Sequence, residues 1–173
     1  MGIFDAIERE FPRIFEDELS KEALYAEKKT IYVEILKHAR LELMEGAADL
    51  LISLSERGIK RAVVTNSPRE QIEIIKESLP VLKSIPLWIT REDYSHPKPS
   101  PEGYLTAIRK LVEPGDRIIG FEDTLKGLKA LLGAGVESIL VCPTQSDHVA
   151  ECISLGAKHF ESLSSIIFDS NEV

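Results

Sequence analysis

The spacing of hydrophobic residues along the chain changes near residue 45. Residues 1–44 are rich in Glu, Lys, Leu and Ile, with glycine only at Gly2 and proline only at Pro12. Their apolar positions recur at helical spacing, which predicts two or three helices, the longest over about 20–42. After Gly46, short β-rich runs alternate with helical stretches. The pattern therefore predicts a helical segment over residues 1–44 and a second region over residues 45–173.

The second region is predicted to form a sheet covered by helices. Strands are expected at 61–65, 87–90, 117–121 and 137–142, and helices at about 46–58, 68–79, 100–112, 124–134 and 146–155. Strands that alternate with helices of this length are typical of a parallel sheet with helices on both faces. Ser67-Pro68-Arg69-Glu70 has the form of a capping box at the start of one helix. The sequence thus predicts an α/β fold with a Rossmann-like parallel sheet.

Polar residues follow three expected strands, at the edge of the sheet where such folds bind ligands. Thr65 and Asn66 follow the first strand and precede a helix, a combination that suits an anion; the alternative is that both are turn residues. Lys98 lies between Pro97 and Pro99. Two prolines are expected to keep this backbone extended, so that the ammonium points in a fixed direction beside a phosphate. Otherwise Lys98 is a solvated loop lysine.

Two further sites carry candidate chemistry. His96 is either a general acid, a ligand, or a loop residue with neither role. Glu122 and Asp123 are adjacent carboxylates at the end of a hydrophobic strand. They fit an N-cap of the next helix or a Mg²⁺ site, because Mg²⁺ is held by one or two carboxylates together with phosphate oxygens.

Composition narrows the class of protein. The chain has 173 residues, 21 basic and 29 acidic, and a formal net charge of −8. This balance argues against a nucleic-acid partner or a membrane partner. No apolar run is long enough for a membrane span, and the acidic start predicts no secretory signal, so a cytoplasmic location is expected. Cys142 and Cys152 are expected to be buried in a reducing compartment. A nucleotide-binding Rossmann domain is disfavoured, because no GxGxxG follows a strand.

Taken together, VVTNS, HPKPSPEGY and GFEDTLKGLKA resemble motifs II, III and IV of the haloacid dehalogenase (HAD) superfamily. The nearest branch is that of capped phosphatases and phosphomutases, such as the phosphoglycolate phosphatase and β-phosphoglucomutase types. The run EGAADLLISLSERGIKRAVVTNS is similar to that branch as well, with Glu45 where a proline is usual. The resemblance covers about residues 43–165. It implies a HAD-like core and an N-terminal helical partial cap.

The resemblance also implies roles for the strand-end residues. Thr65 would hydrogen-bond the phosphoryl oxygens, with Asn66 in support, and Lys98 would neutralise the phosphoryl group and the attacking carboxylate. Asp123, with Glu122 beside it, would hold Mg²⁺. The implied function is a Mg²⁺-dependent phosphatase that acts on a small phosphorylated metabolite through an aspartyl-phosphate. A dehalogenase is a weaker interpretation, because that chemistry does not need the Mg²⁺ carboxylates.

One family motif is not recognisable in this sequence. Members of the family begin with a strand that ends in Asp-x-Asp, in which the first Asp is the nucleophile and the second is the acid and base. The weak candidates for the nucleophile are Asp5 and Asp169, and Asn171 stands where the second Asp is expected. The alternative is that Asp5 belongs to a cap helix and that 162–168 form a terminal helix or strand. A non-catalytic HAD-like domain or fragment, which at most binds phosphate, Mg²⁺ or a protein partner, is therefore a second hypothesis.

The missing strand has a structural consequence. In the family it lies between the motif II and motif IV strands, so its loss leaves two unpaired edges. We expect the sheet to close by direct pairing of these two strands, or to be filled by a segment such as 165–169. The third possibility is a strand from a neighbouring chain, which would make a homo-oligomer through the incomplete sheet.

Overall fold

The computed structural model describes residues 9–10 and 20–166. The contacts divide the chain into two units, Met1–Arg40 and Leu41–Val173. In the first unit, helix α3 (Lys21–His38) begins after Ser20, whose side chain accepts a hydrogen bond of 2.9 Å from the N–H of Ala23. This is the long helix that the sequence predicts. Within the described ranges, no helix is both long and apolar enough to cross a bilayer.

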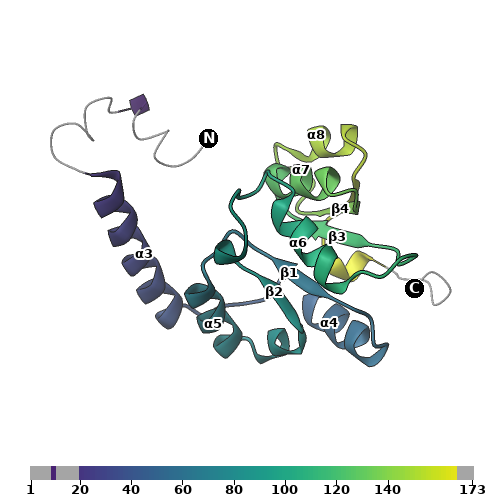
Figure 1. The fold of residues 1–173 in the computed structure, drawn as a ribbon, viewed down its shortest axis with the longest axis horizontal. Coiled ribbons are helices and arrows are strands. Elements are labelled where there is room, and N and C mark those ends of the chain that lie inside the picture. Colours follow the sequence, from purple (N-terminus) through teal and green to yellow (C-terminus); the bar gives the residue numbers. More distant parts are fainter. Residues whose placement is uncertain (1–8, 11–19, 167–173) are drawn as a thin grey trace. The chain divides into compact units, whose positions relative to one another are not determined.

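The second unit alternates strands and helices (Figure 1). Its strands are β1 (Ala62–Val64), β2 (Leu87–Ile89), β3 (Ile119–Glu122), β4 (Glu137–Val141) and β5 (Lys158–Phe160). Its α-helices are α4 (Ala47–Glu56), α5 (Arg69–Ser78), α6 (Glu102–Leu111), α7 (Leu125–Gly133) and α8 (Val149–Ser154). Three short 3₁₀ helices, η1 (Pro80–Ser84), η2 (Arg91–Asp93) and η3 (Leu163–Ser165), complete the described unit. Every predicted strand and helix of this region is present, and β5 is an addition.

The strands form two parallel sheets, which confirms the parallel prediction. One sheet is β1–β2, with Val63 opposite Trp88, and the other is β3–β4–β5, with Phe121 opposite Ile139. The expected direct pairing of β1 with β3 is therefore wrong. Residues 167–169 of the alternative filling segment lie outside the described residues, and pairing with a strand of a neighbouring chain stays a prediction.

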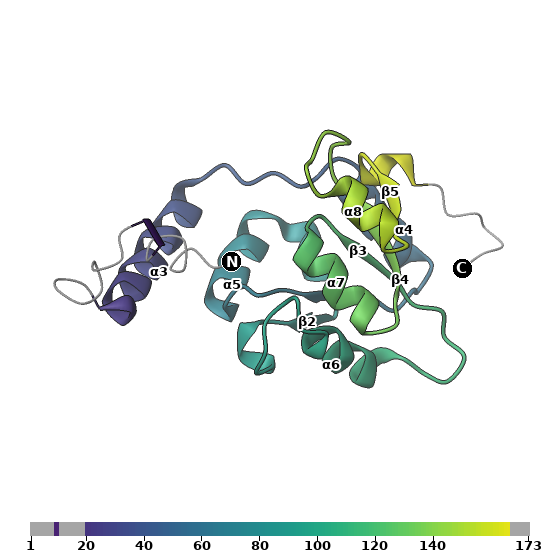
Figure 2. The same cartoon turned by 90° about the horizontal axis from the view of Figure 1, so that it is seen from above.

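The helices that cover the two sheets contact one another. Helix α6 packs on β1 and β2, α7 packs on β3 and β4, and α6 contacts α7 (Figures 1 and 2). The contact between α6 and α7 therefore connects the two sheets, although β1 and β3 do not pair.

Each sheet has its own hydrophobic core. The core of the first consists of Ile89, Tyr94 and Ala107, with Ala62, Val64 and Leu87 against them. The core of the second consists of Leu128, Leu140, Cys142, Val149, Cys152 and Ala157. Both cysteines are buried and free, as expected. Strand β4 is almost wholly buried, whereas β1 and β3 are only half-buried. The two strands that border the division between the sheets therefore lack full cover.

The predicted capping box at Ser67 is wrong. Pro68 is the N-cap of α5 and makes no side-chain capping bond. The carboxylate of Glu92 accepts the N–H of Arg69 instead, at 3.1 and 3.2 Å. The N–H of Ser67 itself donates to the hydroxyl of Thr65 at 3.0 Å. A negative charge near a helix N-terminus is stabilising, so the folded chain caps α5 from η2 rather than from within the helix.

Gly46 is expected to be irreplaceable at the start of α4. Its φ is +80°, and a Cβ there would lie 2.8 Å from the Cα of Ser164 in η3. Gly46→Ala is therefore expected to lower the free energy of unfolding by more than the cost of a left-handed alanine alone, which is about 1–2 kcal/mol. The control is Gly58→Ala, because Gly58 has a φ of +67° and open space around it. Urea unfolding of both variants measures the difference, and equal losses would contradict the close approach of η3.

Candidate active site

A tight turn presents Lys98 to the carboxyl ends of the strands. The N–H of Ser100 donates to the carbonyl of Pro97 at 3.0 Å, and the Lys98–Pro99 peptide bond is cis. The expected extended backbone is thus wrong, because the hydrogen bond from Ser100 closes the segment into a turn.

The ammonium of Lys98 has three acceptors. It donates to the carbonyl of Val64 at 2.8 Å, to the hydroxyl of Tyr104 at 3.0 Å and, in a short contact, to Oε1 of Glu122. An ammonium has three N–H groups, so this set satisfies it completely. The Lys98 side chain is 12% exposed and that of Glu122 is 8% exposed. Lys98 is therefore not a solvated loop lysine.

The carbonyl of Val64 lies on the inner edge of β1, which is the edge that faces away from β2. The N–H of Thr65, in the same peptide unit, donates to Ile89 of β2 at 2.9 Å. Because the two polar groups of a trans peptide point in opposite directions, the carbonyl of Val64 points away from β2. Lys98 therefore connects the inner edge of β1 to the last residue of β3, Glu122.

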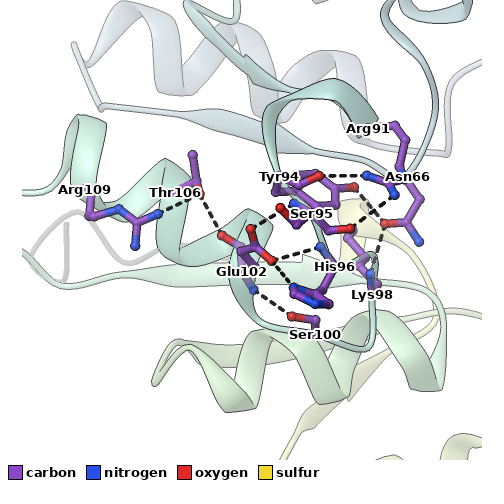
Figure 3. A network of polar contacts seen from close by, with 10 residues as sticks. All are labelled: Asn66, Arg91, Tyr94, Ser95, His96, Lys98, Ser100, Glu102, Thr106 and Arg109. Carbon is purple, nitrogen blue, oxygen red and sulfur yellow. Dashed lines mark hydrogen bonds and ion pairs between the residues drawn. The ribbon is translucent and has the colours of Figure 1, made fainter.

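Thr65 and Asn66 fix the loop that carries Lys98. The side-chain oxygen of Asn66 accepts the N–H of Lys98 at 3.1 Å and lies 2.8 Å from the hydroxyl of Tyr94 (Figure 3). The same hydroxyl lies 2.6 Å from the carbonyl of Thr65. Tyr94 is buried and carries no sequence signal that pointed to the site. Thr65 and Asn66 thus make the contacts of turn residues, which was the alternative to an anion site, and they lie at the same edge of the sheet as Lys98.

Glu102 holds the preceding part of this loop. Its carboxylate accepts the N–H of Ser95 and the N–H of His96, both at 2.9 Å, and lies 2.8 Å from Nδ1 of His96 (Figure 3). These hydrogen bonds, those from the two backbone N–H groups first, lower the pKa of Glu102 from 4.5 to about 2. The His96 side chain is 79% exposed. Glu102, which the sequence did not single out, orders the loop.

The loop is expected to lose this support in acid. Glu102 has a lower pKa in the folded chain than its ordinary 4.5, so its ionised form favours folding. Its contribution is complete above pH 4.5 and is lost as the pH falls towards about 2. The difference in free energy of unfolding between wild type and Glu102→Gln should therefore shrink across this range. Glu77→Gln, at an exposed position, controls for the loss of one negative charge. A difference that stays constant down to pH 2 would contradict this role of the Glu102 carboxylate in ordering the loop.

Glu122 lies over the first turn of α7. A Cβ at Gly127, in that turn, would overlap the Glu122 carboxylate, with Oε1 only 2.6 Å away. The N-cap of α7 is Thr124, whose hydroxyl accepts the N–H of Gly127 at 3.2 Å. The capping interpretation of Glu122 and Asp123 is therefore wrong, because Thr124 takes that position.

Asp123 lies next to this cluster and is exposed. Its carbonyl lies 2.9 Å from Nε2 of His148. Burial raises the pKa of Tyr104 above its usual range, and the charges of Glu122 and Asp123 raise it further. Both carboxylates are therefore within electrostatic reach of one phenol.

The donor set suits Mg²⁺ better than a softer metal. Within the described part of the chain, no three His, Cys, Asp or Glu side chains form a metal-binding group. Mg²⁺ needs only one or two carboxylates, with water and phosphate oxygens as its other ligands. Glu122 and Asp123 fit that requirement, provided that the ion takes the place of Lys98 at Glu122.

The structure brings together Thr65, Asn66, Lys98 and Glu122, with Asp123 beside them. The two nucleophile candidates, Asp5 and Asp169, lie outside the described residues. Tyr94, Glu102 and Tyr104 are additional residues of the site that the sequence did not reveal.

Three comparisons identify relatives. Over 112 residues the chain is 37% identical to validoxylamine A 7'-phosphate phosphatase from Streptomyces hygroscopicus subsp. limoneus. This alignment covers 64% of the chain and 51% of the relative. Over 120 residues it is 29% identical to a phosphorylated carbohydrates phosphatase from Thermotoga maritima, covering 69% and 53%. A crystal structure of a CbbY variant from Rhodobacter sphaeroides, in complex with xylulose-(1,5)bisphosphate, matches with a TM-score of 0.73 and 26% identity, covering 85% and 66%.

The chain spans about half the length of these curated relatives. Both relatives are phosphatases by name, and the CbbY structure shares the fold described above. A family model of haloacid dehalogenase-like hydrolases matches residues 3–135. The chain belongs to the haloacid dehalogenase-like hydrolases.

Proposed function

We propose that this chain carries the phosphoryl- and metal-binding residues of a Mg²⁺-dependent phosphatase for a small phosphorylated metabolite. The observation that carries the proposal is the buried ammonium of Lys98, held between the carbonyl of Val64 and the carboxylate of Glu122. Phosphoryl transfer depends on positioned charges that neutralise the transferring group. The phosphatases among the relatives, and the CbbY complex with a sugar bisphosphate, support this substrate class.

The residues divide into two groups in the proposed reaction. The Thr65 hydroxyl and the Asn66 amide hydrogen-bond the phosphoryl oxygens, and Lys98 neutralises their charge. Glu122 and Asp123 hold Mg²⁺, which supplies further neutralisation of the phosphoryl oxygens when bound. The Lys98 ammonium exchanges the Glu122 carboxylate for the anionic substrate.

The proposed reaction has two displacements at phosphorus. A carboxylate attacks the phosphorus, the bond to the metabolite oxygen breaks, and that oxygen takes up a proton. Water then attacks the phosphorus and gives up a proton, which replaces the one taken up in the first step, the bond to the carboxylate breaks, and inorganic phosphate leaves with the carboxylate regenerated. Asp5 and Asp169 are the candidates for this carboxylate within the chain.

A second candidate function rests on the separate sheets. Within the residues that the structure describes, β1 and β3 lie in different sheets, and a strand of another polypeptide inserted between them would join the two sheets. Under this alternative the chain is a non-catalytic HAD-like domain that pairs with a partner, such as a second copy of itself. Sedimentation equilibrium tests the second copy, because self-pairing predicts association that increases with protein concentration.

Hydrolysis of 4-nitrophenyl phosphate tests the phosphatase. We expect turnover by the 173-residue chain that needs added Mg²⁺ and is lost in Asp123→Asn and in one of Asp5→Asn and Asp169→Asn. That pattern would also identify the nucleophile. Turnover no higher than that of Asp123→Asn would contradict catalysis by this chain and leave the second candidate.

A further inference from the structure

Tyr104 contacts both charged residues at the centre of the site. Its hydroxyl lies 3.0 Å from Nζ of Lys98 and makes a short hydrogen bond to Oε1 of Glu122. The Lys98 ammonium also lies 4.8 Å from the centroid of the Tyr104 ring. This distance is within the range of a cation–π interaction. Tyr104 stands in the first turn of α6, so a rigid element positions it.

The direction of both hydrogen bonds follows from the chemistry of the groups. An ammonium only donates, and an ionised carboxylate only accepts. The Tyr104 oxygen therefore accepts from Lys98, and its single proton is donated to Glu122. A phenol keeps its proton at neutral pH, so this hydroxyl is a donor to Glu122 and an acceptor from Lys98 at the same time.

The two residues that Tyr104 contacts have opposite tasks in the proposed function. Lys98 meets the phosphoryl group and Glu122 meets Mg²⁺, so the direct contact between them must open when both ligands are present. Tyr104 can keep its hydrogen bond to Glu122 and its ring contact with Lys98 after that exchange. We propose that Tyr104 is a positioning residue: its hydroxyl aims the Glu122 carboxylate at Mg²⁺, and its ring keeps the Lys98 ammonium in place. This inference rests on the proposed function.

The size of the expected effect follows from comparable contacts. Hydrogen bonds from outer residues to a metal-binding side chain fix its orientation, and their removal costs roughly 10–100-fold in metal affinity. Tyr104→Phe removes one oxygen atom and leaves the ring and its packing in place. The variant therefore separates the hydrogen bond from the bulk of the side chain.

Calorimetric titration of the full chain with Mg²⁺ alone, at neutral pH, tests the inference. We expect the Kd for Mg²⁺ to rise about 10-fold or more in Tyr104→Phe. Tyr32→Phe is the matched control, because Tyr32 is 44% exposed on α3, in the other unit. Its Kd should stay within about twofold of wild type.

Each outcome has a distinct meaning. If Tyr104→Phe only destabilised the fold, the binding stoichiometry would fall while the Kd remained at the wild-type value, and the inference would be overturned. An unchanged Kd with full stoichiometry would overturn it as well, with the proposed function intact. Wild-type protein that binds no Mg²⁺ would overturn the proposed metal site itself, and the positioning role with it.

Discussion

Lys98→Met is expected to destabilise the protein by about 3–5 kcal/mol, because it leaves a buried carboxylate without its cation. Glu122 is 8% exposed in its pair with Lys98, and water cannot replace the ammonium without opening the site. The carbonyl of Val64 and the hydroxyl of Tyr104 also lose a donor. Urea unfolding with a two-state analysis measures the loss.

An exposed ion pair in the same unit provides the control. Lys129 lies 2.8 Å from Glu151, and their side chains are 45% and 50% exposed. Lys129→Met is expected to cost less than about 1 kcal/mol, since solvent screens such pairs. The double variant Lys98→Met with Glu122→Gln should recover much of the stability, because neither charge is then buried alone. Equal losses in Lys98→Met and Lys129→Met would show that the central pair contributes nothing special.

Gly127→Ala is expected to reverse the usual effect of alanine in a helix. Alanine normally stabilises an exposed helical position by about 1 kcal/mol relative to glycine. At Gly127 the new Cβ would overlap the Glu122 carboxylate, as the 2.6 Å approach of Oε1 indicates. We expect a loss of about 1–3 kcal/mol from this overpacking. Displacement of Glu122 should also weaken Mg²⁺ binding by roughly 10-fold or more.

Removal of the carboxylate tests the cause. In a Glu122→Ala background the overlap with Gly127 is gone, so the added Gly127→Ala change should become neutral or stabilising, by up to about 1 kcal/mol. Urea unfolding of the two single variants and the double variant gives this coupling. A Gly127→Ala loss of the same size in both backgrounds would place its cause elsewhere than at Glu122.

The sequence was sufficient for the elements of the fold because their signals are local. Alternation of apolar runs with helical stretches located β1 to β4 and the helices between them to within a few residues. Strand β5 was missed, because Lys158–Phe160 is a three-residue edge strand with an exposed lysine and a histidine. The cap of α5 was misassigned because its acceptor, Glu92, comes from a different element. Contacts between distant elements have no local pattern.

The residues of the candidate site also divide into those with a local sequence signal and those that depend on contacts between distant segments. Thr65, Lys98 and Glu122 were identifiable from their places after strands. Thr65 follows β1, Lys98 lies in the loop after β2, and Glu122 ends β3. Parallel strands bring their carboxyl ends to one edge of a sheet, where ligands bind. Tyr94, Glu102 and Tyr104 were not, because each acts through a partner in another segment. Spacing also gave no indication that Lys98 and Glu122 satisfy one another. Only the three-dimensional contacts show that these two side chains form a buried ion pair.

The division into two sheets has a consequence for hydrogen exchange. Strand β4 is paired on both sides, so its amides should exchange slowest. In an extended strand the N–H of a residue points to the same edge as its carbonyl, so the Val64 amide lies on the inner edge of β1 and should exchange much faster. Each sheet also has its own core, so protection should be lost separately in the two. Slowing of the Val64 amide on addition of another polypeptide would then report that a strand has been added at that edge.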